Sequence, residues 1–380
     1  MKNSKGVILF VSHEASVTGA PLFLFNLLKS INNDDFPYDI VVHFVNGGPL
    51  VGLYEKEGFR VTAFEKANHN LNLFLKYYNR IEYYLKFFSL VVKIRPKMLY
   101  SNSILNIFQV VGVRMLGIKT LVHMHEGINI ASKLGVIFRF SAFFTSKYIC
   151  GSYYTSNVLK KLTGRVGVVI HNGIDVAESE DIDKCDKSVC SLSVVGTIDR
   201  NKAQMVAIMA VERLVKMRKI NVKLNIFGRV GDRNYYDEIC DYVENNGLRS
   251  IVTFIDFVNT IDEAYRKTDV LIVPSLDEAF PTVILEAMAY RKPVIASNTG
   301  GIPEIVSDGF TGLLFIPGNV ESLVGKLLIL LNNDYKQMLI HNAYQNVADN
   351  FSHFKAIRKI VQVIDSMIGE CRSVFPAGSQ

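Results

Sequence analysis

Two glutamates and a predicted helix start lie in the stretch 274–304, and their spacing suits ligand binding. An apolar run at 270–273 predicts a buried parallel strand, and helical periodicity begins near Pro281. Glu278 therefore falls in the loop before the helix, and Glu286 falls inside it. The free N–H groups and positive dipole end of a helix N-terminus suit a phosphate, and carboxylates accept hydrogen bonds from hydroxyls. The stretch predicts a site for a ligand that carries both groups, as a nucleotide sugar does.

The whole stretch resembles the donor-binding segment of retaining glycosyltransferases of the GT-B fold, in the large family 4 (group 1 glycosyltransferases). Seven residues separate Glu278 from Glu286. The other matching runs are Glu286-Ala-Met-Ala, then Lys292-Pro-Val-Ile-Ala-Ser, then Gly300-Gly-Ile-Pro-Glu304. Two glutamates alone would also fit a solvated helix face or a helix cap, so the order of the whole block carries the resemblance.

The resemblance implies a role for each matching residue. Glu278 would hold hydroxyls of the transferred sugar, and Glu286 would bind the ribose hydroxyls. The backbone N–H groups of Phe280, Thr282 and Val283 would face the diphosphate.

A second phosphate-binding position is expected in the loop after a predicted strand at 191–198. In the family this loop reads Gly-Arg-Leu, followed shortly by Lys-Gly. Gly196 and Lys202 match, whereas Thr197 stands where the arginine is usual. Lys202 would offset the charge of the leaving diphosphate, and the alternative is a solvated surface lysine. The missing guanidinium weakens the case for bidentate phosphate binding, and we hypothesise that Arg200 compensates from the same loop.

The first half of the chain begins with a strand, a turn of small residues and a helix. This order is Rossmann-like, although the turn is not a GxGxxG. Gly19 in the turn lets a ligand approach the backbone closely, and the resemblance places it near the donor's diphosphate and the acceptor. An ordinary strand-to-helix turn is the alternative. His13, at the end of the strand 6–13, is a lesser candidate for the acceptor side.

His125 and Glu126 follow a predicted strand at 119–124, at the edge where ligands of open α/β sheets bind. The resemblance implies that His125 contacts the sugar near its anomeric carbon, and we group Glu126 with the acceptor side. A histidine satisfied in the core is the alternative. His123 shares a face with His125, but no third metal ligand is apparent and the family needs none. We expect no metal and no cofactor beyond the nucleotide-diphosphate sugar.

Alternating strands and helices predict an α/β chain with two Rossmann-like parallel-sheet domains. The length of 380 residues suits two domains. We expect an N-terminal acceptor-binding domain at 1–175, completed by a C-terminal helix at 351–370. A linker at 176–190 and a donor-binding domain at 191–350 complete the chain. The resemblance implies a GT-B arrangement, in which the domains face each other across a cleft.

The charge is uneven along the sequence. Residues 1–175 carry 20 Lys+Arg against 10 Asp+Glu, and residues 176–380 carry 22 against 26. A basic first half favours anionic partners such as a lipid surface or a phosphate-bearing acceptor. No nucleic-acid-binding signature is present, and no apolar run is long enough to span a bilayer.

A predicted helix at 71–94 interleaves aromatic and basic residues, which is typical of a helix that lies on a membrane. The alternative is that its apolar residues form a core face, namely Leu75, Tyr78, Ile81, Leu85, Phe88 and Val92. We therefore expect a cytoplasmic protein, with peripheral contact at the inner face of the cytoplasmic membrane.

The resemblance implies a retaining hexosyltransferase that uses a UDP-, GDP- or dTDP-sugar. The acceptor would be a saccharide or a lipid-linked saccharide, in the assembly of bacterial surface polysaccharide such as lipopolysaccharide. Two alternatives stay open. One is another GT-B enzyme, such as a nucleotide-sugar epimerase or a phosphorylase, and the other is a non-catalytic subunit that binds a saccharide or a partner enzyme.

Overall fold

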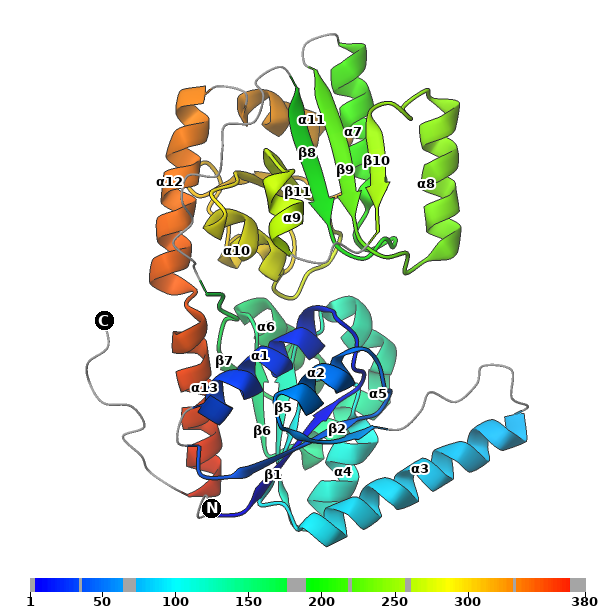
Figure 1. The fold of residues 1–380 in the computed structure, drawn as a ribbon, viewed down its shortest axis with the longest axis vertical. Coiled ribbons are helices and arrows are strands. Elements are labelled where there is room, and N and C mark those ends of the chain that lie inside the picture. The colour runs from blue at the N-terminus through cyan, green and yellow to red at the C-terminus, as the bar shows by residue number, and fades with distance from the viewer. Residues whose placement is uncertain are drawn as a thin grey trace. The chain divides into compact units, whose positions relative to one another are not determined.

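The structure is a computed structural model that describes residues 4–33, 36–63, 73–175, 189–217, 221–256, 261–330 and 333–369. The chain divides into two compact units, one formed by 1–171 with 355–380 and the other by 172–354. Each unit is built on a parallel sheet with helices packed on it (Figure 1). The predicted fold class, α/β with two Rossmann-like domains, is confirmed. Residues 176–188 of the predicted linker lie outside the described residues.

The first unit has a seven-stranded sheet in the order β3-β2-β1-β4-β5-β6-β7. Its strands are β1 (Val7–Ser12), β2 (Asp39–Phe44), β3 (Arg60–Ala63), β4 (Met98–Ser101), β5 (Lys119–Met124), β6 (Lys147–Cys150) and β7 (Val168–Val169). Its helices are α1 (Gly19–Asn33), α2 (Leu50–Lys56), α3 (Leu73–Ile94), α4 (Ile107–Met115), α5 (Ile128–Phe144), α6 (Tyr153–Thr163) and α13 (His353–Ile368).

Alternation along β1 explains why helices cover both faces of this sheet. Ile8 and Phe10 point into a cluster formed with α1, α2 and α13, whereas Leu9 and Val11 point into a cluster formed with α3 to α6. A strand buried on both faces reads as a continuous apolar run, which is how the sequence reads here. The layers position the ends of β1, β4 and β5 side by side, because these three strands are neighbours in the sheet.

Three helices of the first unit, α2, α5 and α6, were not placed by the sequence analysis. A sequence signal exists for α6, since Ser152 and Thr155 form a reciprocal capping box at its start. The pattern of α5 is interrupted at Gly135, whose backbone is not helical.

The alternative interpretation of α3, in which its apolar residues form a core face, is mostly wrong. Phe87 and Val91 are buried, and the Phe87 ring packs 5.0 Å from that of His43. Of the residues named for that core face, Phe88 is partly buried against the core, whereas four are exposed: Tyr78, Ile81, Leu85 and Val92. The helix is apolar over more than one face, so periodicity alone did not decide which face the core takes. The side chain of Leu75 lies outside the described residues.

The second unit has a six-stranded sheet in the order β10-β9-β8-β11-β12-β13. Its strands are β8 (Cys190–Val195), β9 (Val222–Phe227), β10 (Val252–Ile255), β11 (Val270–Val273), β12 (Val294–Ser297) and β13 (Leu313–Phe315). Its helices are α7 (Gln204–Lys216), α8 (Arg233–Asn245), α9 (Ile261–Arg266), α10 (Thr282–Ala289), α11 (Val320–Leu330) and α12 (Asn333–Asn350), with a short 3₁₀ turn at Ile302–Glu304.

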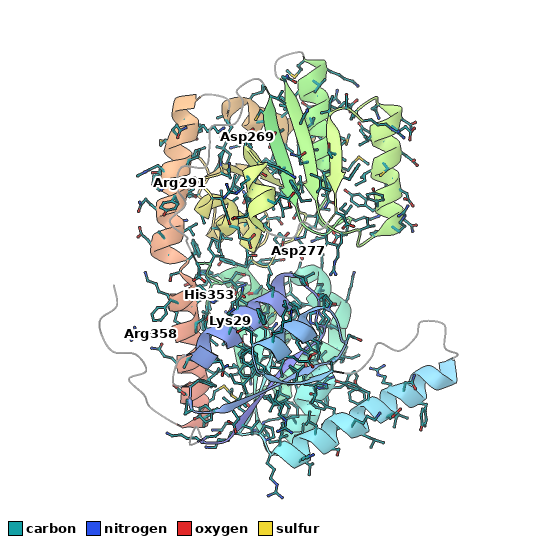
Figure 2. The ribbon with its side chains drawn as sticks, viewed as in Figure 1. Lys29, Asp269, Asp277, Arg291, His353 and Arg358 are labelled. Carbon is teal, nitrogen blue, oxygen red and sulfur yellow. The ribbon has the colours of Figure 1, made fainter. Side chains whose placement is uncertain are left out.

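The predicted buried strand at 270–273 is β11, and all four of its residues are buried. After α10 the chain turns at Arg291, whose guanidinium lies 4.0 Å from the centre of the Tyr344 ring on α12 (Figure 2). This contact ties the turn between α10 and β12 to α12, so the loop before α10 is carried on a well-packed part of the unit.

Candidate functional site

Among the described residues, no side chain caps the start of α10. Pro281 is the N-cap residue rather than the first helical residue. Its backbone is extended, and its side chain makes no capping hydrogen bond. Its carbonyl accepts a hydrogen bond from the backbone N–H of Ile284 at 3.2 Å. Thr282 and Val283 are therefore the first two helical residues, and their N–H groups belong to the turn that a helix leaves for capping groups or anions.

Glu278 and Lys202 are brought together from different loops. Lys202 Nζ forms an ion pair with Glu278 Oε1, and Ser275 Oγ donates to the same oxygen at 2.7 Å. The Glu278 side chain is only 11% exposed. Burial by itself would lower the pKa of Lys202, but the charge and hydrogen bond of Glu278 outweigh it and raise that pKa. Lys202 is therefore a charged ammonium held beside the carboxylate rather than a solvated surface lysine.

The backbone joins the same two loops. Leu276 N–H donates to Asn201 O at 2.8 Å, and Asn201 Nδ2 donates to Asp277 O at 2.8 Å. Figure 2 shows Asp277 in the loop that follows β11. Because the loop after β8 and the loop after β11 are fastened to each other, the Lys202–Glu278 pair is positioned by main chain as well as by its own charges.

The glycine pair at 300–301 supports Glu278 from behind. Gly301 N–H donates to Glu278 O at 2.8 Å, and Gly300 has a φ of +55°. A Cβ at Gly300 would lie 2.1 Å from Glu278 O, so a side chain there would displace the loop. This part of the motif sets the position of the glutamate through the backbone.

Glu286 lies in a different environment on α10. The Tyr265 hydroxyl donates to Glu286 Oε2 at 3.0 Å, and the Tyr265 ring stacks on that of Tyr290 with their centres 5.1 Å apart. Burial raises the pKa of Glu286, and hydrogen bonds from Tyr265 and Thr282 oppose the shift. Its predicted contact with ribose hydroxyls would thus be made by a carboxylate that Tyr265 already orients.

Arg200 is directed at α8. Its Nη2 lies 2.7 Å from Glu238 Oε2, and its guanidinium carbon lies 5.4 Å from the centre of the Tyr235 ring. Thr197 offers its carbonyl to Gln204 Nε2 at 2.9 Å. An exposed ion pair of this kind is weak, so a phosphate could compete for the guanidinium at small cost. The compensating role of Arg200 stays a prediction.

In the first unit, polar residues meet at the carboxyl ends of β4 and β5. His125 Nε2 lies 3.1 Å from Asn102 Oδ1, and Asn102 Nδ2 donates to Ala20 O at 2.7 Å. Only the amide nitrogen of Asn102 can donate to a carbonyl, so its oxygen faces His125. Burial, and secondarily His13, lowers the pKa of His125 to about 3, so the ring is neutral. Neutral His125 must then carry its proton on Nε2, which leaves Nδ1 as a hydrogen-bond acceptor.

Two more histidines lie beside His125. The His123 ring is centred 4.0 Å from that of His125, and the Tyr100 hydroxyl lies 2.6 Å from His123 Nδ1. Burial lowers the pKa of His13, against the charge of Glu14. Among the described residues, no group of three or more His, Cys, Asp or Glu side chains could hold a metal ion.

Glu126 points into the interior of the first unit. Ser103 Oγ donates to Glu126 Oε1, and the backbone N–H of His125 donates to Oε2 at 3.0 Å. Burial raises the pKa of Glu126, and the hydrogen bond from Ser103 opposes the shift most. The carboxylate therefore fastens the end of β5 to the turn after β4, and its acceptor-side role stays a prediction.

Gly19 begins α1, and a Cβ there would meet no atom within 4 Å. Asn102 joins this turn to His125 through Ala20. The sequence analysis missed three residues of these arrangements: Asn102, Tyr265 and Ser275. Asn102 directly follows β4, so the strand-end rule that selected His125 would have found it.

Comparison with known proteins identifies a family model and several relatives. Residues 182–346 match the family model described as "Glycosyl transferases group 1". An uncharacterised glycosyltransferase of Methanocaldococcus jannaschii, MJ1607, is 30% identical over 208 residues, which are 51% of this chain and 53% of that protein. The lipopolysaccharide 1,2-N-acetylglucosaminetransferase of Salmonella typhimurium is 30% identical over 169 residues, 42% of this chain and 44% of that protein. The matches thus span about half the length of these curated relatives.

Solved structures match the whole fold. Anabaena Alr3699/HepE in complex with UDP and glucose has a TM-score of 0.82 at 20% identity, covering 94% of this chain and 99% of that one. WaaG, described as a glycosyltransferase involved in lipopolysaccharide biosynthesis, has a TM-score of 0.72 at 15% identity, covering 94% and 99%. Both likenesses show the fold, which is GT-B.

Proposed function

We propose that this chain is a glycosyltransferase that moves a sugar from a nucleotide-diphosphate sugar to a hydroxyl of a saccharide acceptor. The observation that carries the proposal is the Lys202–Glu278 pair in the second unit. The same unit contains the N-terminus of α10, which has no side-chain cap among the described residues. The match to the group 1 family model covers these residues. The Anabaena protein of the same fold, solved with UDP and glucose, supports a nucleotide-sugar donor.

The second unit would stabilise the departing diphosphate. The N–H groups of Thr282 and Val283 at the start of α10 would bind phosphate oxygens, with Phe280 N–H beside them. Lys202 has three N–H donors and uses one on Glu278. The others would neutralise the charge that grows on the phosphate as the bond to the sugar breaks. Glu278 would accept hydrogen bonds from sugar hydroxyls through its remaining lone pairs.

The first unit would contribute an uncharged hydrogen-bond acceptor, the imidazole of His125. The unprotonated Nδ1 of His125 would accept a hydrogen bond from a donor-sugar hydroxyl near the anomeric carbon, and His13 and Gly19 would lie toward the acceptor. We propose a hexose donor and retention of configuration. The acceptor hydroxyl would attack from the face that the phosphate leaves, and the leaving phosphate would help to take its proton. This scheme needs no metal and no cofactor.

We further propose a lipid-linked saccharide acceptor in bacterial surface polysaccharide assembly, at the inner face of the cytoplasmic membrane. The Salmonella lipopolysaccharide relative supports this role, as does the apolar stripe exposed along α3. No helix within the described ranges is both long and apolar enough to cross a bilayer. If α3 touches lipid, the purified protein should co-sediment with anionic vesicles at low salt, and its failure to do so would contradict the α3 contact.

The activity can be tested with a panel of labelled UDP-, GDP- and dTDP-sugars. One donor, at a hundred times its dissociation constant, should stabilise the protein by about 2.7 kcal/mol in a thermal-shift assay. The same donor should then be turned over with an acceptor. Glu278→Ala should lower turnover by about ten- to a hundredfold, the loss of a hydrogen bond to a charged group.

The matched control is Glu321→Ala, because Glu321 is exposed on α11 and only pairs with Arg213. Equal turnover by both variants would refute the site. Conversion of the donor without an acceptor would favour an epimerase, and donor or saccharide binding without turnover would favour a non-catalytic subunit.

A further inference from the structure

The first unit has a cavity of about 520 Å³ at the amino-terminal ends of the strands of its sheet. Lys119 and Lys147, which line it, are the first residues of β5 and β6, whereas His125 follows the last residue of β5. The cavity therefore lies at the amino-terminal ends of the strands, and the His125 cluster lies at their carboxyl-terminal ends. The lining residues are Arg114, Gly117, Lys119, Phe143, Phe144, Thr145, Ser146, Lys147, Arg165, Ser366 and Met367.

Four of these residues are cationic, and none of the lining residues that the structure describes is acidic. The contacts of the cations are with uncharged groups. Arg165 Nη2 donates to Thr145 O at 2.9 Å, and Lys119 Nζ donates to Met367 O at 2.5 Å. Lys147 Nζ lies 3.4 Å from Ser366 Oγ. Within the described part of the chain, no carboxylate lines the cavity to offset the positive charge.

Basic residues at helix C-termini are common, because they complement the negative end of the helix dipole. Three helices, α4, α5 and α13, reach the cavity with residues of their C-terminal ends. Each end is equivalent to about −0.5 of an elementary charge, so three ends supply about −1.5 against four positive charges. An excess of about +2.5 is left, which is more than helix capping requires.

Exposed apolar side chains surround the same cavity. Phe143 is 82% exposed, and Phe140 on the same helix is 58% exposed. Their rings are 5.5 and 5.0 Å from that of Phe144, which lines the cavity. Next to Arg114, Met115 is 74% exposed and Leu116 is 52% exposed. Aromatic and aliphatic side chains that flank cations suit the boundary between headgroups and acyl chains, whereas a free anion needs no such rim.

We propose that this cavity binds the phosphate headgroup of an anionic membrane phospholipid, with Phe140, Phe143 and Met115 entering the acyl boundary. Cations would hold the phosphate, and the apolar rim would replace water with lipid. The proposal goes beyond the transferase activity, because it uses neither α10 nor the His125 cluster. It also differs from the α3 contact, because none of the four cations that line the cavity lies on α3.

The test is co-sedimentation of the full chain with vesicles of phosphatidylglycerol and phosphatidylcholine, against phosphatidylcholine alone. Arg114→Gln with Lys147→Gln should weaken partitioning by about thirty-fold, since each Lys or Arg near an anionic surface contributes about fivefold. Phe140→Ser with Phe143→Ser should weaken it as well. The control Lys56→Gln with Lys223→Gln removes the same charge from α2 and β9. Arg165 is left in place because it caps α5.

Equal partitioning of the Arg114/Lys147 variant and its control would overturn the proposal. Displacement by inorganic phosphate, together with an unchanged Phe140/Phe143 variant, would overturn it too and indicate a site for a free anion. Thermal melts check that the variants fold. Turnover of the soluble donor is measured on every variant, so failure of this proposal is distinguished from failure of the transferase assignment.

Discussion

The two units hold their candidate residues in opposite electrostatic states. In the second unit, Lys202 and Glu278 are both charged and are paired with each other. In the first unit, His123 is buried and His125 is half-buried, and both have strongly lowered pKa values, about 3 for His125. One site keeps its charges by pairing them, and the other removes charge by burial.

This difference suits two kinds of ligand group. A pyrophosphate brings negative charge, so a pre-paired ammonium can meet it without leaving a buried charge uncompensated. A sugar hydroxyl is uncharged, and a neutral imidazole with a fixed tautomer can accept its hydrogen bond without a charge to desolvate. The comparison leads us to expect distinct responses of the two units to acid and to substitution.

Acid should destabilise the first unit most. Burial lowers the pKa values of His43 to about 4, of His125 to about 3, and of His123 well below its usual value of 6.5. Between pH 6.5 and about 4 the unfolded state binds more protons than the folded state, so stability falls as the pH falls. Each histidine contributes up to about 1.4 kcal/mol per pH unit.

The raised pKa values of Glu286 in the second unit and Glu126 in the first act in the other direction, because protonation relieves the burial of each carboxylate. In the first unit the three histidines outweigh Glu126, whereas Glu286 has no such opponents among the groups considered for the second. Hydrogen exchange followed from pH 7 to pH 4 should therefore show the first unit opening before the second. His43→Gln should reduce the pH dependence of the first unit's stability by the contribution of one histidine. Simultaneous opening of both units would break the comparison.

Loss of the ammonium in the second unit should cost donor affinity. Lys202→Ala should weaken donor binding by about 1.5–3 kcal/mol, the range for a hydrogen bond to a charged group. Isothermal titration with the donor identified by thermal shift measures the effect. Arg213→Ala is the matched control, because its exposed pair with Glu321 makes a change below about 1 kcal/mol the expectation. Arg200→Ala tests the compensating role, with an expected loss smaller than that of Lys202→Ala because the guanidinium is already paired with Glu238. A larger loss in the Arg200 variant would move the phosphate contact to that residue.

Loss of the amide in the first unit should have the smallest effect, and it should fall on turnover. Asn102→Ala frees the tautomer of His125, so kcat should fall by about fivefold to tenfold, equivalent to one neutral hydrogen bond. The donor dissociation constant should hardly change. Asn102→Asp keeps an acceptor for Nε2–H but brings a negative charge that raises the pKa of His125. Its turnover should therefore fall toward acid pH, and identical pH profiles for both variants would contradict the tautomer argument.

The second site was largely predictable because its signals are close in sequence. Glu278, the helix start and the glycine pair all lie within 274–304, whereas Lys202 and the missed Tyr265 come from outside this stretch. The first site is assembled from three strand ends, and the bond from Asn102 to Ala20 joins residues 82 positions apart. Local pattern selects strand ends but not the partner that each side chain finds there. The sequence also did not predict which face of α3 is buried, for a related reason. The helix has two apolar faces, and the packing of Phe87 on His43 decides between them.

Side chains added at Gly19 and at Gly300 would have different effects, because the space around the two glycines differs. Enlarging Gly300 would push against Glu278 and disturb the scaffold itself. Enlarging Gly19 would project a methyl group into open space at the start of α1. If a ligand approaches the backbone at Gly19 as predicted, a single alanine or valine there would obstruct it while leaving the core unaltered, giving a folded reference protein for measurements of ligand occupancy.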